Sequence, residues 1–216
     1  MRWGMVIDRK RCIGCYSCQI ACKQEHALPP GVFWGRVIIG ESGKYPAVTK
    51  QILPVLCNHC KEAACVKVCP TQATTRREED GLVIIDSNKC VGCRYCVIAC
   101  PYQNRTFYAD GKKEYWPGQG FTELELMGRQ LYPLQPGTVI KCNFCVERID
   151  AGLKKGLKPG LDREATPACV ITCPAKARYF GDLDDPNSEV SRLIIERKGA
   201  QLHPEYGTDP SVYYLT

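Results

Sequence analysis

The sequence lacks the long apolar segments that cross membranes. A membrane-spanning helix needs about 20 consecutive apolar residues, and no stretch of the 216-residue chain approaches that length. No charged n-region with an apolar h-region and no twin-arginine motif precedes the first apolar residues, so we expect no export signal on this chain. Histidine is rare, with three residues, and no residue stands in a pattern typical of a catalytic acid, base or nucleophile. We therefore expect neither a membrane span nor a catalytic residue here.

Cysteine, by contrast, is abundant and grouped. The sixteen cysteines form four runs of four, with none left over. The runs are Cys12, Cys15, Cys18 and Cys22; Cys57, Cys60, Cys65 and Cys69; Cys90, Cys93, Cys96 and Cys100; and Cys142, Cys145, Cys169 and Cys173. A disulfide framework is typical of short secreted chains, and this chain is neither short nor fitted with a signal peptide. A tetrahedral zinc site is a poor fit to three cysteines in a C-x2-C-x2-C run.

One run has the spacing with which bacterial ferredoxins bind iron–sulfur clusters. Residues 90–101 read C-x2-C-x2-C-x3-C-P. The first three cysteines can surround one cubane cluster on a tight loop, whereas the fourth lies on the helix that follows and binds a neighbouring cluster. One such run therefore predicts two clusters and a second run that completes them.

The runs repeat along the chain. Residues 84–100 align with residues 6–22 without a gap, and residues 57–70 resemble residues 142–174 except for a longer insert in the latter. Such a repeat predicts an α+β fold of two interleaved modules, each resembling a bacterial ferredoxin with two [4Fe-4S] clusters.

The middle two runs form one module. Twenty residues separate Cys69 from Cys90, and Asp80-Gly81 is a turn signal between two segments rich in β-forming residues. A hairpin of this size is the natural connection in an ordinary two-cluster ferredoxin. We assign this inner module to about residues 50–108.

Hydrophobic patterns and turn residues predict the remaining elements. We expect strands around Met5–Ile7, at 37–39, 51–53 and 178–180, and helices at 17–26 and 144–153. Asn187 and Ser188 can cap a helix through Val190, Leu193 and Ile194, and residues 212–215 form a strand or an arm that contacts a partner.

Residues 109–138 contain no cysteine and interrupt the ferredoxin pattern. They are rich in glycine, proline and aromatic residues, among them Tyr115, Trp116, Phe121 and Tyr132. A long loop without obvious secondary structure is usually functional, and aromatic residues are typical of protein interfaces. We expect this insert either to contact a partner or to cover a cluster.

The formal net charge of +6 omits the clusters. Four cubanes on sixteen thiolates add a charge of roughly −8, so the complete protein is near neutral or mildly acidic and the charge gives no support for nucleic-acid binding. Lys10, Arg11, Lys89 and Lys141 precede the first cysteines of three runs. They either raise the potential of a nearby cluster or belong to an ordinary solvated surface, and both interpretations remain open.

His59 lies inside the second run, between Cys57 and Cys60. It can donate a hydrogen bond to a cluster sulfur or serve as an alternative ligand. Because four thiols are already available in the run, we favour simple packing or surface exposure.

The four runs, followed by FGDLDDPNS at residues 180–188, resemble the iron–sulfur electron-transfer subunit of the dimethyl sulfoxide reductase family of molybdenum enzymes. Small subunits of polysulfide, thiosulfate, tetrathionate and arsenate reductases are similar. The resemblance covers essentially the whole chain. It implies four [4Fe-4S] clusters that relay single electrons between a large catalytic subunit, which carries a molybdenum or tungsten bis-pterin cofactor, and a quinone-linked membrane subunit or a soluble redox partner.

The resemblance also implies how the runs pair. In the family the outer runs fold together, here residues 1–49 and 139–184, and enclose the inner module, with residues 185–216 as a C-terminal helix and arm. Together with the rule for the fourth cysteine, this implies four ligand sets. They are set 1 (Cys12, Cys15, Cys18, Cys173), set 2 (Cys22, Cys142, Cys145, Cys169), set 3 (Cys57, Cys60, Cys65, Cys100) and set 4 (Cys69, Cys90, Cys93, Cys96). Lys23 follows Cys22 where the other runs have proline, which leaves the ligands intact.

Two other functions compete with this interpretation. Subunits of formate dehydrogenases or hydrogenases often add a C-terminal membrane helix, which is absent here. A free polyferredoxin that shuttles electrons, or a redox-sensing iron–sulfur protein, would not need the aromatic insert. For the complex we expect export on the partner's signal to the outer face of the cytoplasmic membrane, with a cytoplasmic location as the alternative.

Overall fold

The computed structural model describes residues 1–109 and 114–216. In this part of the chain, short helices are combined with a four-stranded sheet and three two-stranded sheets, a mixed helix-and-strand structure as the sequence predicted. None of its helices combines the length and the apolar character that a membrane crossing requires.

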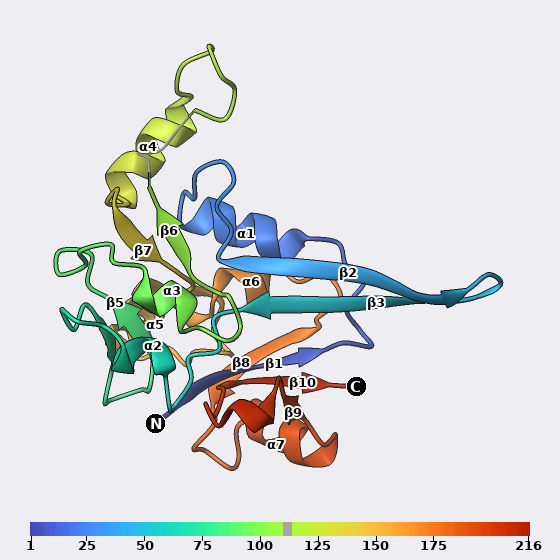
Figure 1. Cartoon of the computed structure of the whole chain (residues 1–216). Coiled ribbons are helices and arrows are strands. Elements are labelled where there is room, and N and C mark those ends of the chain that lie inside the picture. Colours follow the sequence, from blue (N-terminus) through green and yellow to red (C-terminus); the bar gives the residue numbers. More distant parts are fainter. Residues whose placement is uncertain (110–113) are drawn as a thin grey trace.

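The N- and C-terminal segments meet in the four-stranded sheet, whose order is β8-β1-β10-β9 (Figure 1). Strand β1 (Trp3–Asp8) is buried along its whole length. It pairs antiparallel with β8 (Arg178–Asp182) and parallel with β10 (Val212–Leu215). The short β9 (Ala200–Gln201) pairs with β10 at the edge. Residues 212–215 are therefore a strand of this sheet.

Helix α7 (Glu189–Glu196) is the capped helix that the sequence predicted, and it packs on the four-stranded sheet. The side chain of Ser188 accepts a hydrogen bond from the Ser191 amide at 3.2 Å and caps the helix. Val190 on the inner face is fully buried and packs with Val6 of β1. A cap and one apolar stripe thus attach this helix to the sheet.

Strands β2 (Gly35–Lys44) and β3 (Ala47–Leu56) form a hairpin arm that projects far from the body (Figure 1). Residues 53–56 at its base are buried or half-buried, whereas every residue from 40 to 51 is exposed. The predicted strands at 37–39 and 51–53 are only short parts of β2 and β3. An isolated two-stranded hairpin is at best marginally stable in water, so the outer half of the arm gains nothing from the core.

Two further hairpins lie beside the body. Strand β4 (Thr74–Arg76) pairs with β5 (Val83–Ile85) across the predicted turn, in which the Asp80 carboxylate accepts a hydrogen bond from the Leu82 amide. Strand β6 (Thr106–Tyr108) pairs with β7 (Thr138–Ile140), so the two ends of the insert are joined by a ladder.

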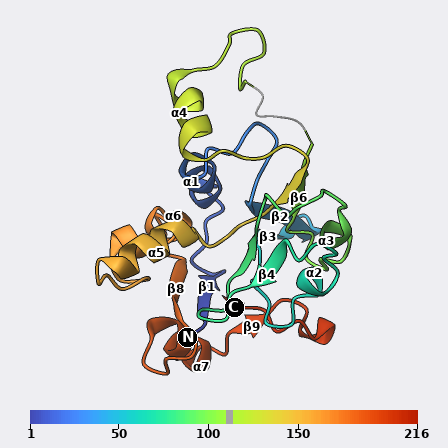
Figure 2. The same ribbon diagram turned by 90° about the vertical axis from the view of Figure 1, so that its left-hand side faces the viewer.

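Four of the described helices contain cysteines of the runs, and they pack in pairs. Helix α1 (Ser17–Glu25) contacts α6 (Ala168–Ile171), and α2 (Ala64–Lys67) contacts α3 (Tyr95–Ile98). Figure 2 shows α6 on one side of the molecule and α2 and α3 on the other.

Corresponding positions of the cysteine loops share left-handed backbone conformations. Gly14 and Gly92 have φ values of 69° and 67°, and Tyr16 and Arg94 have φ values of 62° and 65°. Glycine is needed at position 92 in particular, because a Cβ atom there would collide with the carbonyl oxygen of Gly137.

The insert contains a helix that the sequence analysis missed. Helix α4 (Glu123–Leu131) starts with a capping box, in which Thr122 and Glu125 exchange hydrogen bonds. We expected residues 109–138 to lack secondary structure because glycine, proline and aromatic residues dominate the segment. The T-x-x-E sequence at residues 122–125 is the local signal that indicates the start of this helix.

Helix α5 (Val146–Lys154) begins two residues after the predicted start, because Phe144 and Cys145 have left-handed backbone conformations, with φ values of 58° and 55°. The Phe144 side chain belongs to the core. The Phe144 ring stacks on His59 with ring centroids 4.0 Å apart and meets the edge of Phe180 at 5.4 Å. This aromatic cluster joins the second and fourth cysteine runs. Two 3-10 turns, η1 (Arg163–Ala165) and η2 (Pro204–Tyr206), complete the described elements.

Candidate iron–sulfur centres

Set 1 surrounds one cavity beside β1. Cys12, Cys15 and Cys18 come from the loop before α1 and its first turn, and Cys173 follows α6. All four side chains line the same cavity, and Arg178 of β8 forms part of its wall. The structure therefore brings together three cysteines of the first run with the last cysteine of the fourth.

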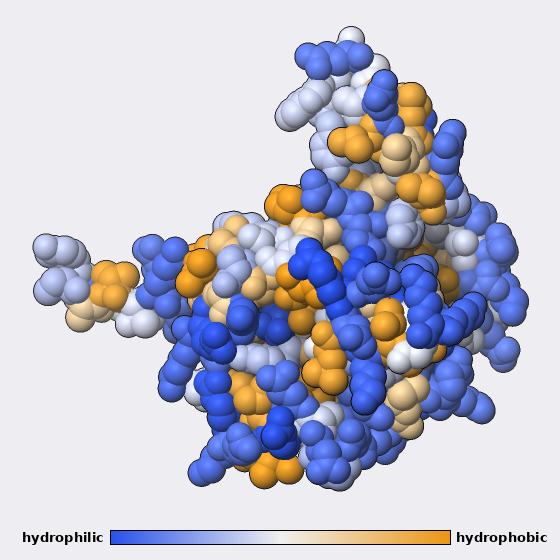
Figure 3. All heavy atoms as spheres, turned by 180° about the vertical axis from the view of Figure 1, so that it is seen from behind, coloured by the Kyte–Doolittle hydropathy of each residue, from blue (hydrophilic) through white to orange (hydrophobic). Residues whose placement is uncertain are grey.

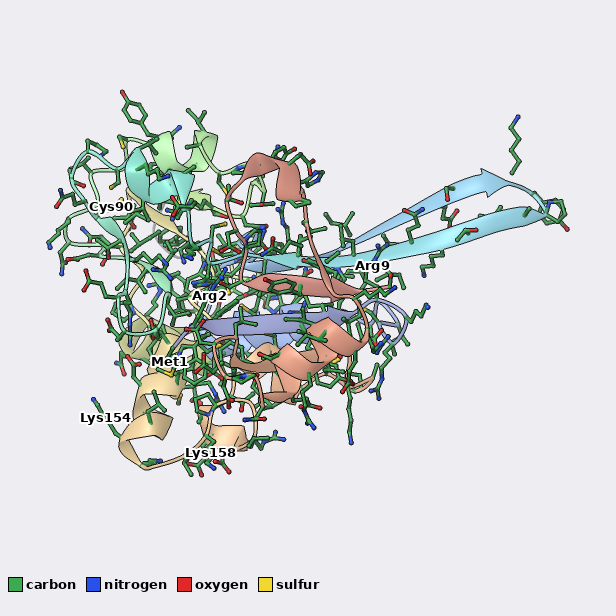
Figure 4. The ribbon with its side chains drawn as sticks, turned by 90° about the horizontal axis from the view of Figure 1, so that it is seen from below. Met1, Arg2, Arg9, Cys90, Lys154 and Lys158 are labelled. Atoms are coloured by element: carbon green, nitrogen blue, oxygen red, sulfur yellow. The ribbon has the colours of Figure 1, made fainter. Side chains whose placement is uncertain are left out.

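Set 4 surrounds a second cavity on the opposite side of the body. Cys69, Cys90, Cys93 and Cys96 line it together. The amide of Thr74 donates a hydrogen bond to the Cys69 sulfur at 3.4 Å. Figure 4 shows Cys90 on the side of the molecule away from the hairpin arm.

Set 2 lies deep in the molecule. Burial, followed by the neighbouring Cys142 and Cys169, raises the pKa of the Cys22 thiol well above its ordinary value. Burial also raises the pKa of Cys142 to about 12 and that of Cys145 well above its usual range, and Cys169 acts on both. The four thiols of the set are thus close enough to oppose one another's ionisation.

Set 3 is arranged in the same way. Burial raises the pKa of Cys60 to about 12, with further contributions from Cys57, Cys65 and Cys100. Burial likewise raises the pKa of Cys65, although Arg105 lowers it in part. Three cysteines of the second run are therefore gathered with the last cysteine of the third.

The sets are connected in a row. Burial is the main cause of the raised pKa of Cys22, and Cys18 of set 1 adds to it. In the same way Cys57 of set 3 adds to the effect of burial on Cys142 of set 2. Cys18 and Cys22 also lie about one turn apart on α1. Cys57 and Cys142 belong to the same buried core cluster. Set 2 therefore lies between set 1 and set 3.

Set 4 follows set 3 at the far end of the row. The positive charge of Arg105 acts on Cys65 of set 3 and on Cys96 of set 4. Among the sixteen cysteines, all of which are described, only Cys15 of set 1 and Cys93 of set 4 are exposed. The row of sets therefore reaches the surface at its two ends.

Two buried guanidinium groups point into the sets. Arg105 donates hydrogen bonds to the Cys65 sulfur at 2.9 Å and to the Thr74 hydroxyl at 3.2 Å. Arg178 lies 3.7 Å from the Cys169 sulfur. Neither forms an ion pair with a carboxylate of the described residues. A buried cation requires a compensating negative charge, which metal-bound thiolates supply.

The donor chemistry therefore fits iron–sulfur clusters. Each set offers four sulfur donors, whose deprotonation would otherwise be opposed by burial, and a metal core stabilises thiolates in such a site. Within residues 1–109 and 114–216, no group of three or more His, Cys, Asp or Glu side chains is arranged to hold a single metal ion.

His59 is packed in the core rather than exposed at the surface. Its Nε2 is buried without a hydrogen-bond partner among the described residues, so donation to a cluster sulfur stays a prediction. The His59 Nδ1 accepts a hydrogen bond from the Val83 amide at 3.0 Å, and the ring stacks on Phe144. His26, which the sequence analysis did not single out, lies closer to a sulfur, with its Nε2 3.3 Å from that of Cys145. Burial lowers the pKa of His26 to about 4, so the ring is neutral near pH 7.

Sequence reasoning also missed the two arginines. Each is the fifth residue after the last cysteine of a C-P run, Cys100 for Arg105 and Cys173 for Arg178. This shared offset was the available signal. Of the four basic residues that precede first cysteines, Lys10, Arg11 and Lys89 are exposed, and Lys141 is buried.

Comparisons with known proteins also indicate binding of 4Fe-4S clusters. A family described as a 4Fe-4S dicluster domain matches residues 48–115, and one described as a 4Fe-4S binding domain matches residues 3–24. Together with the cysteine-lined cavities, they define an iron–sulfur protein with ferredoxin-type domains.

Similar proteins extend over the whole chain. The B subunit of the selenate reductase of Mesobacillus selenatarsenatis is 40% identical over all of this chain and 72% of its own length. The arsenate respiratory reductase iron–sulfur subunit of Shewanella sp. strain ANA-3 is 39% identical, over all of this chain and 96% of that relative's length. The B subunit of the tetrathionate reductase of Salmonella typhimurium is 40% identical over 99% of this chain and 72% of its own length.

The chain belongs to the family of iron–sulfur B subunits found in dimethyl sulfoxide, selenate, arsenate and tetrathionate reductases and in sulfite dehydrogenase. The resemblance found in the sequence is therefore confirmed. So is the electron-transfer function that it implied.

Proposed function

We propose that this chain holds four [4Fe-4S] clusters, one on each cysteine set. Sets 1 to 4 supply the sixteen thiolates, and each cluster would carry one electron at a time. The grouping of each set around a cavity or within a network of interacting thiols supports this assignment.

The clusters belong to two interleaved ferredoxin-like modules. Residues 1–49 and 139–184 make the outer module and residues 50–108 the inner one, with the insert at 109–138 and the C-terminal segment at 185–216. The pairing of α1 with α6 and of α2 with α3 supports this division, since each pair joins helices of the two run types. The matching φ values of Gly14 and Gly92 support the repeat.

The chain acts as a relay for single electrons. The observation that carries this proposal is the row of sets 1-2-3-4, whose only exposed cysteines, Cys15 and Cys93, lie in the first and last sets. Exposed ends allow electrons to enter and leave, and the cysteines of the two middle sets are all buried or half-buried, which limits their contact with solvent. Nothing in the described site requires an acid, a base or a nucleophile from this chain.

One end of the row contacts a large catalytic subunit with a molybdenum or tungsten bis-pterin cofactor. The other end contacts a quinone-linked membrane subunit or a soluble redox partner. The relatives are named as B subunits or iron–sulfur subunits of reductases, which supports a catalytic partner. The exposed apolar side chains of α4, visible in Figure 3, support a docked subunit over a free one.

The insert serves as both a cover and a contact. Tyr132, just after α4, meets the His26 ring edge-on at 5.6 Å, beside the Cys145 sulfur of set 2. Leu124 and Leu131, by contrast, are 77% and 66% exposed. One part of the insert therefore covers set 2 and the other is available to a partner.

The competing function is a free polyferredoxin shuttle or a redox-sensing iron–sulfur protein. Such a protein would also bind clusters, and its cysteine sets would look the same. It would not form a stable complex with a pterin-containing chain. For the complex we propose the outer face of the cytoplasmic membrane, reached on the partner's export signal, and the cytoplasm remains the alternative.

Anaerobic purification of the tagged chain from its native host tests the proposed function. Mass spectrometry would identify the copurifying chains, and iron, molybdenum and tungsten would be counted on the same sample. We expect about sixteen irons on this chain, from four cubes of four irons, and a large subunit with molybdenum or tungsten. An iron-loaded chain without such a subunit would contradict the relay and favour the free shuttle.

A further inference from the structure

The junction between sets 1 and 2 contains one buried cation. Arg178 lines the set 1 cavity and lies 3.7 Å from the sulfur of Cys169 in set 2. Its charge also acts on Cys18 and Cys173 of set 1. The guanidinium group therefore faces both sets at once.

The junction between sets 2 and 3 contains a second buried cation, Lys141. The Lys141 ammonium group donates hydrogen bonds to the carbonyl oxygens of Cys142, at 2.8 Å, and of Val83. Its charge acts on Cys142 of set 2 and on Cys65 of set 3. The Val83 amide in turn bonds to His59, which lies inside the second run.

The junction between sets 3 and 4 contains a third buried cation, Arg105. Arg105 donates to the Cys65 sulfur of set 3 at 2.9 Å, and its charge acts on Cys96 of set 4. Its second hydrogen bond, to the Thr74 hydroxyl at 3.2 Å, fixes the group between the two sets.

The three buried cations, Arg178, Lys141 and Arg105, differ from several arginines of the chain in having no carboxylate partner. Arg77, Arg148 and Arg2 are each paired with carboxylates, at 2.8–3.1 Å. Arg178, Lys141 and Arg105 are buried, with exposed fractions of 7%, 4% and 6%, and no carboxylate among the described residues pairs with them. Arg178 and Arg105 are directed at cysteine sulfurs instead. Lys141 is held by two backbone carbonyl oxygens, one of them that of Cys142.

We propose that the buried positive charges of Arg178, Lys141 and Arg105, one at each junction, raise the reduction potentials of the two flanking clusters. The same charges reduce the electrostatic repulsion between these clusters. This inference rests on the proposed function. Each electron that enters a cluster adds one negative charge, and a buried cation nearby stabilises that charge more than an exposed one can. The three residues neither gain nor lose an electron or a proton in the relay.

An overlapping pattern of potentials tests the proposal. Neutral variants Arg178→Gln, Lys141→Met and Arg105→Gln would be purified anaerobically with their partners and titrated while the clusters are followed by electron paramagnetic resonance. Each midpoint would first be assigned with a ligand variant of one set, Cys15→Ser, Cys145→Ser, Cys60→Ser or Cys93→Ser. Loss of Arg178 should lower the midpoints of sets 1 and 2, loss of Lys141 those of sets 2 and 3, and loss of Arg105 those of sets 3 and 4.

Two kinds of control separate charge from structure. The charge-keeping variants Arg178→Lys, Lys141→Arg and Arg105→Lys should stay nearer the wild-type midpoints than the neutral ones. Lys89→Met removes an exposed charge next to Cys90 and should leave all four midpoints unchanged, since solvent screens it.

The possible results separate a failure of the charge proposal from a failure of the four-cluster assignment. Unchanged midpoints in fully iron-loaded neutral variants would overturn the proposal, and so would an equal fall in all four midpoints. If one neutral variant fails to retain iron, the other two positions still decide the pattern, because each junction is tested separately. Fewer than four clusters in the wild-type chain would instead refute the proposed function on which this inference rests.

Discussion

At the scale of single residues, Asp8 shows how several donors stabilise a carboxylate in the interior of this fold. Asp8 at the end of β1 is fully buried, and it accepts hydrogen bonds from the amides of Lys10 and Arg11 and from the Arg197 guanidinium. Burial acts to raise the pKa of Asp8, but these partners together outweigh it, so the pKa lies below its ordinary value. The carboxylate therefore fixes the chain just before the first cysteine of set 1.

The Asp8→Asn variant tests this role through its pH dependence. At pH 7 the variant should be less stable by about 1–3 kcal/mol, the usual cost of losing hydrogen bonds to a charged group. Because the pKa of Asp8 is lowered on folding, the wild type holds this stability above the ordinary pKa of 3.8 and loses it as the pH falls below that value. Thermal unfolding of both proteins from pH 7 to pH 3 measures it.

The two stability curves should therefore converge in acid. Curves that stay parallel over the whole range would show that the Asp8 charge contributes nothing and that only shape was changed. Glu62→Gln is a matched control, because that exposed carboxylate pairs with the exposed Lys67 at 2.8 Å, and loss of an exposed ion pair should change stability little.

Local spacing explains which residues could be predicted. The cysteine runs were readable because C-x2-C-x2-C-x3-C-P specifies one loop and one helix turn. The environment of Arg178 was not readable, because Cys18 and Met5 are more than 150 residues away in the sequence. The pairing of the sets came from the family resemblance for the same reason.

At the scale of elements, local sequence signals were sufficient to predict a helix or a hairpin only where a cap or a turn residue within the element defines it. The capped helix α7 and the hairpin β4–β5 were predicted, because a cap and a turn residue are local features. The parallel pairing of β1 with β10 and the antiparallel pairing of β6 with β7 join distant residues. Neither could be derived from a pattern within the strands.

The hairpin arm provides the prediction at this scale. Val37 and Pro54 at its base line the set 1 cavity, beside the exposed Cys15. Residues 41–50 would be replaced by Asn-Gly, a favoured two-residue turn that keeps Gly40 opposite Gln51. The iron content and melting temperature should be unchanged, because these residues are exposed and contribute no buried core.

Binding of the redox partner at the set 1 end should fall. We expect a loss of affinity of roughly tenfold or more, or about 1.4 kcal/mol, measured by titrating the partner against the full-length and shortened chains. A control that replaces Tyr45 and Val48 at the tip by serine keeps the arm's length and should lose less. Equal affinity of the shortened and full-length chains would show that the arm does not contact this partner.

At the scale of the whole molecule, the N-terminal and C-terminal segments of the chain come together in one sheet. Strands β1, β8 and β10 bring both termini into one sheet, and set 1 lies beside it, with ligands that are up to 161 residues apart in the sequence. Loss of one segment would therefore break a cluster site and a sheet together. Figure 4 shows Lys154, the last residue of α5, and Lys158 on a part of the molecule away from both Cys90 and the hairpin arm.

The most direct test of the central claim is to locate the iron atoms. Anomalous diffraction at the iron edge, from crystals grown without oxygen, would position each iron relative to the sixteen cysteine sulfurs. The account predicts four separate iron groups in a row, each bound only by the cysteines of one set, in the order 1-2-3-4. Fewer groups, a group bound by cysteines of two sets, or another order would contradict it.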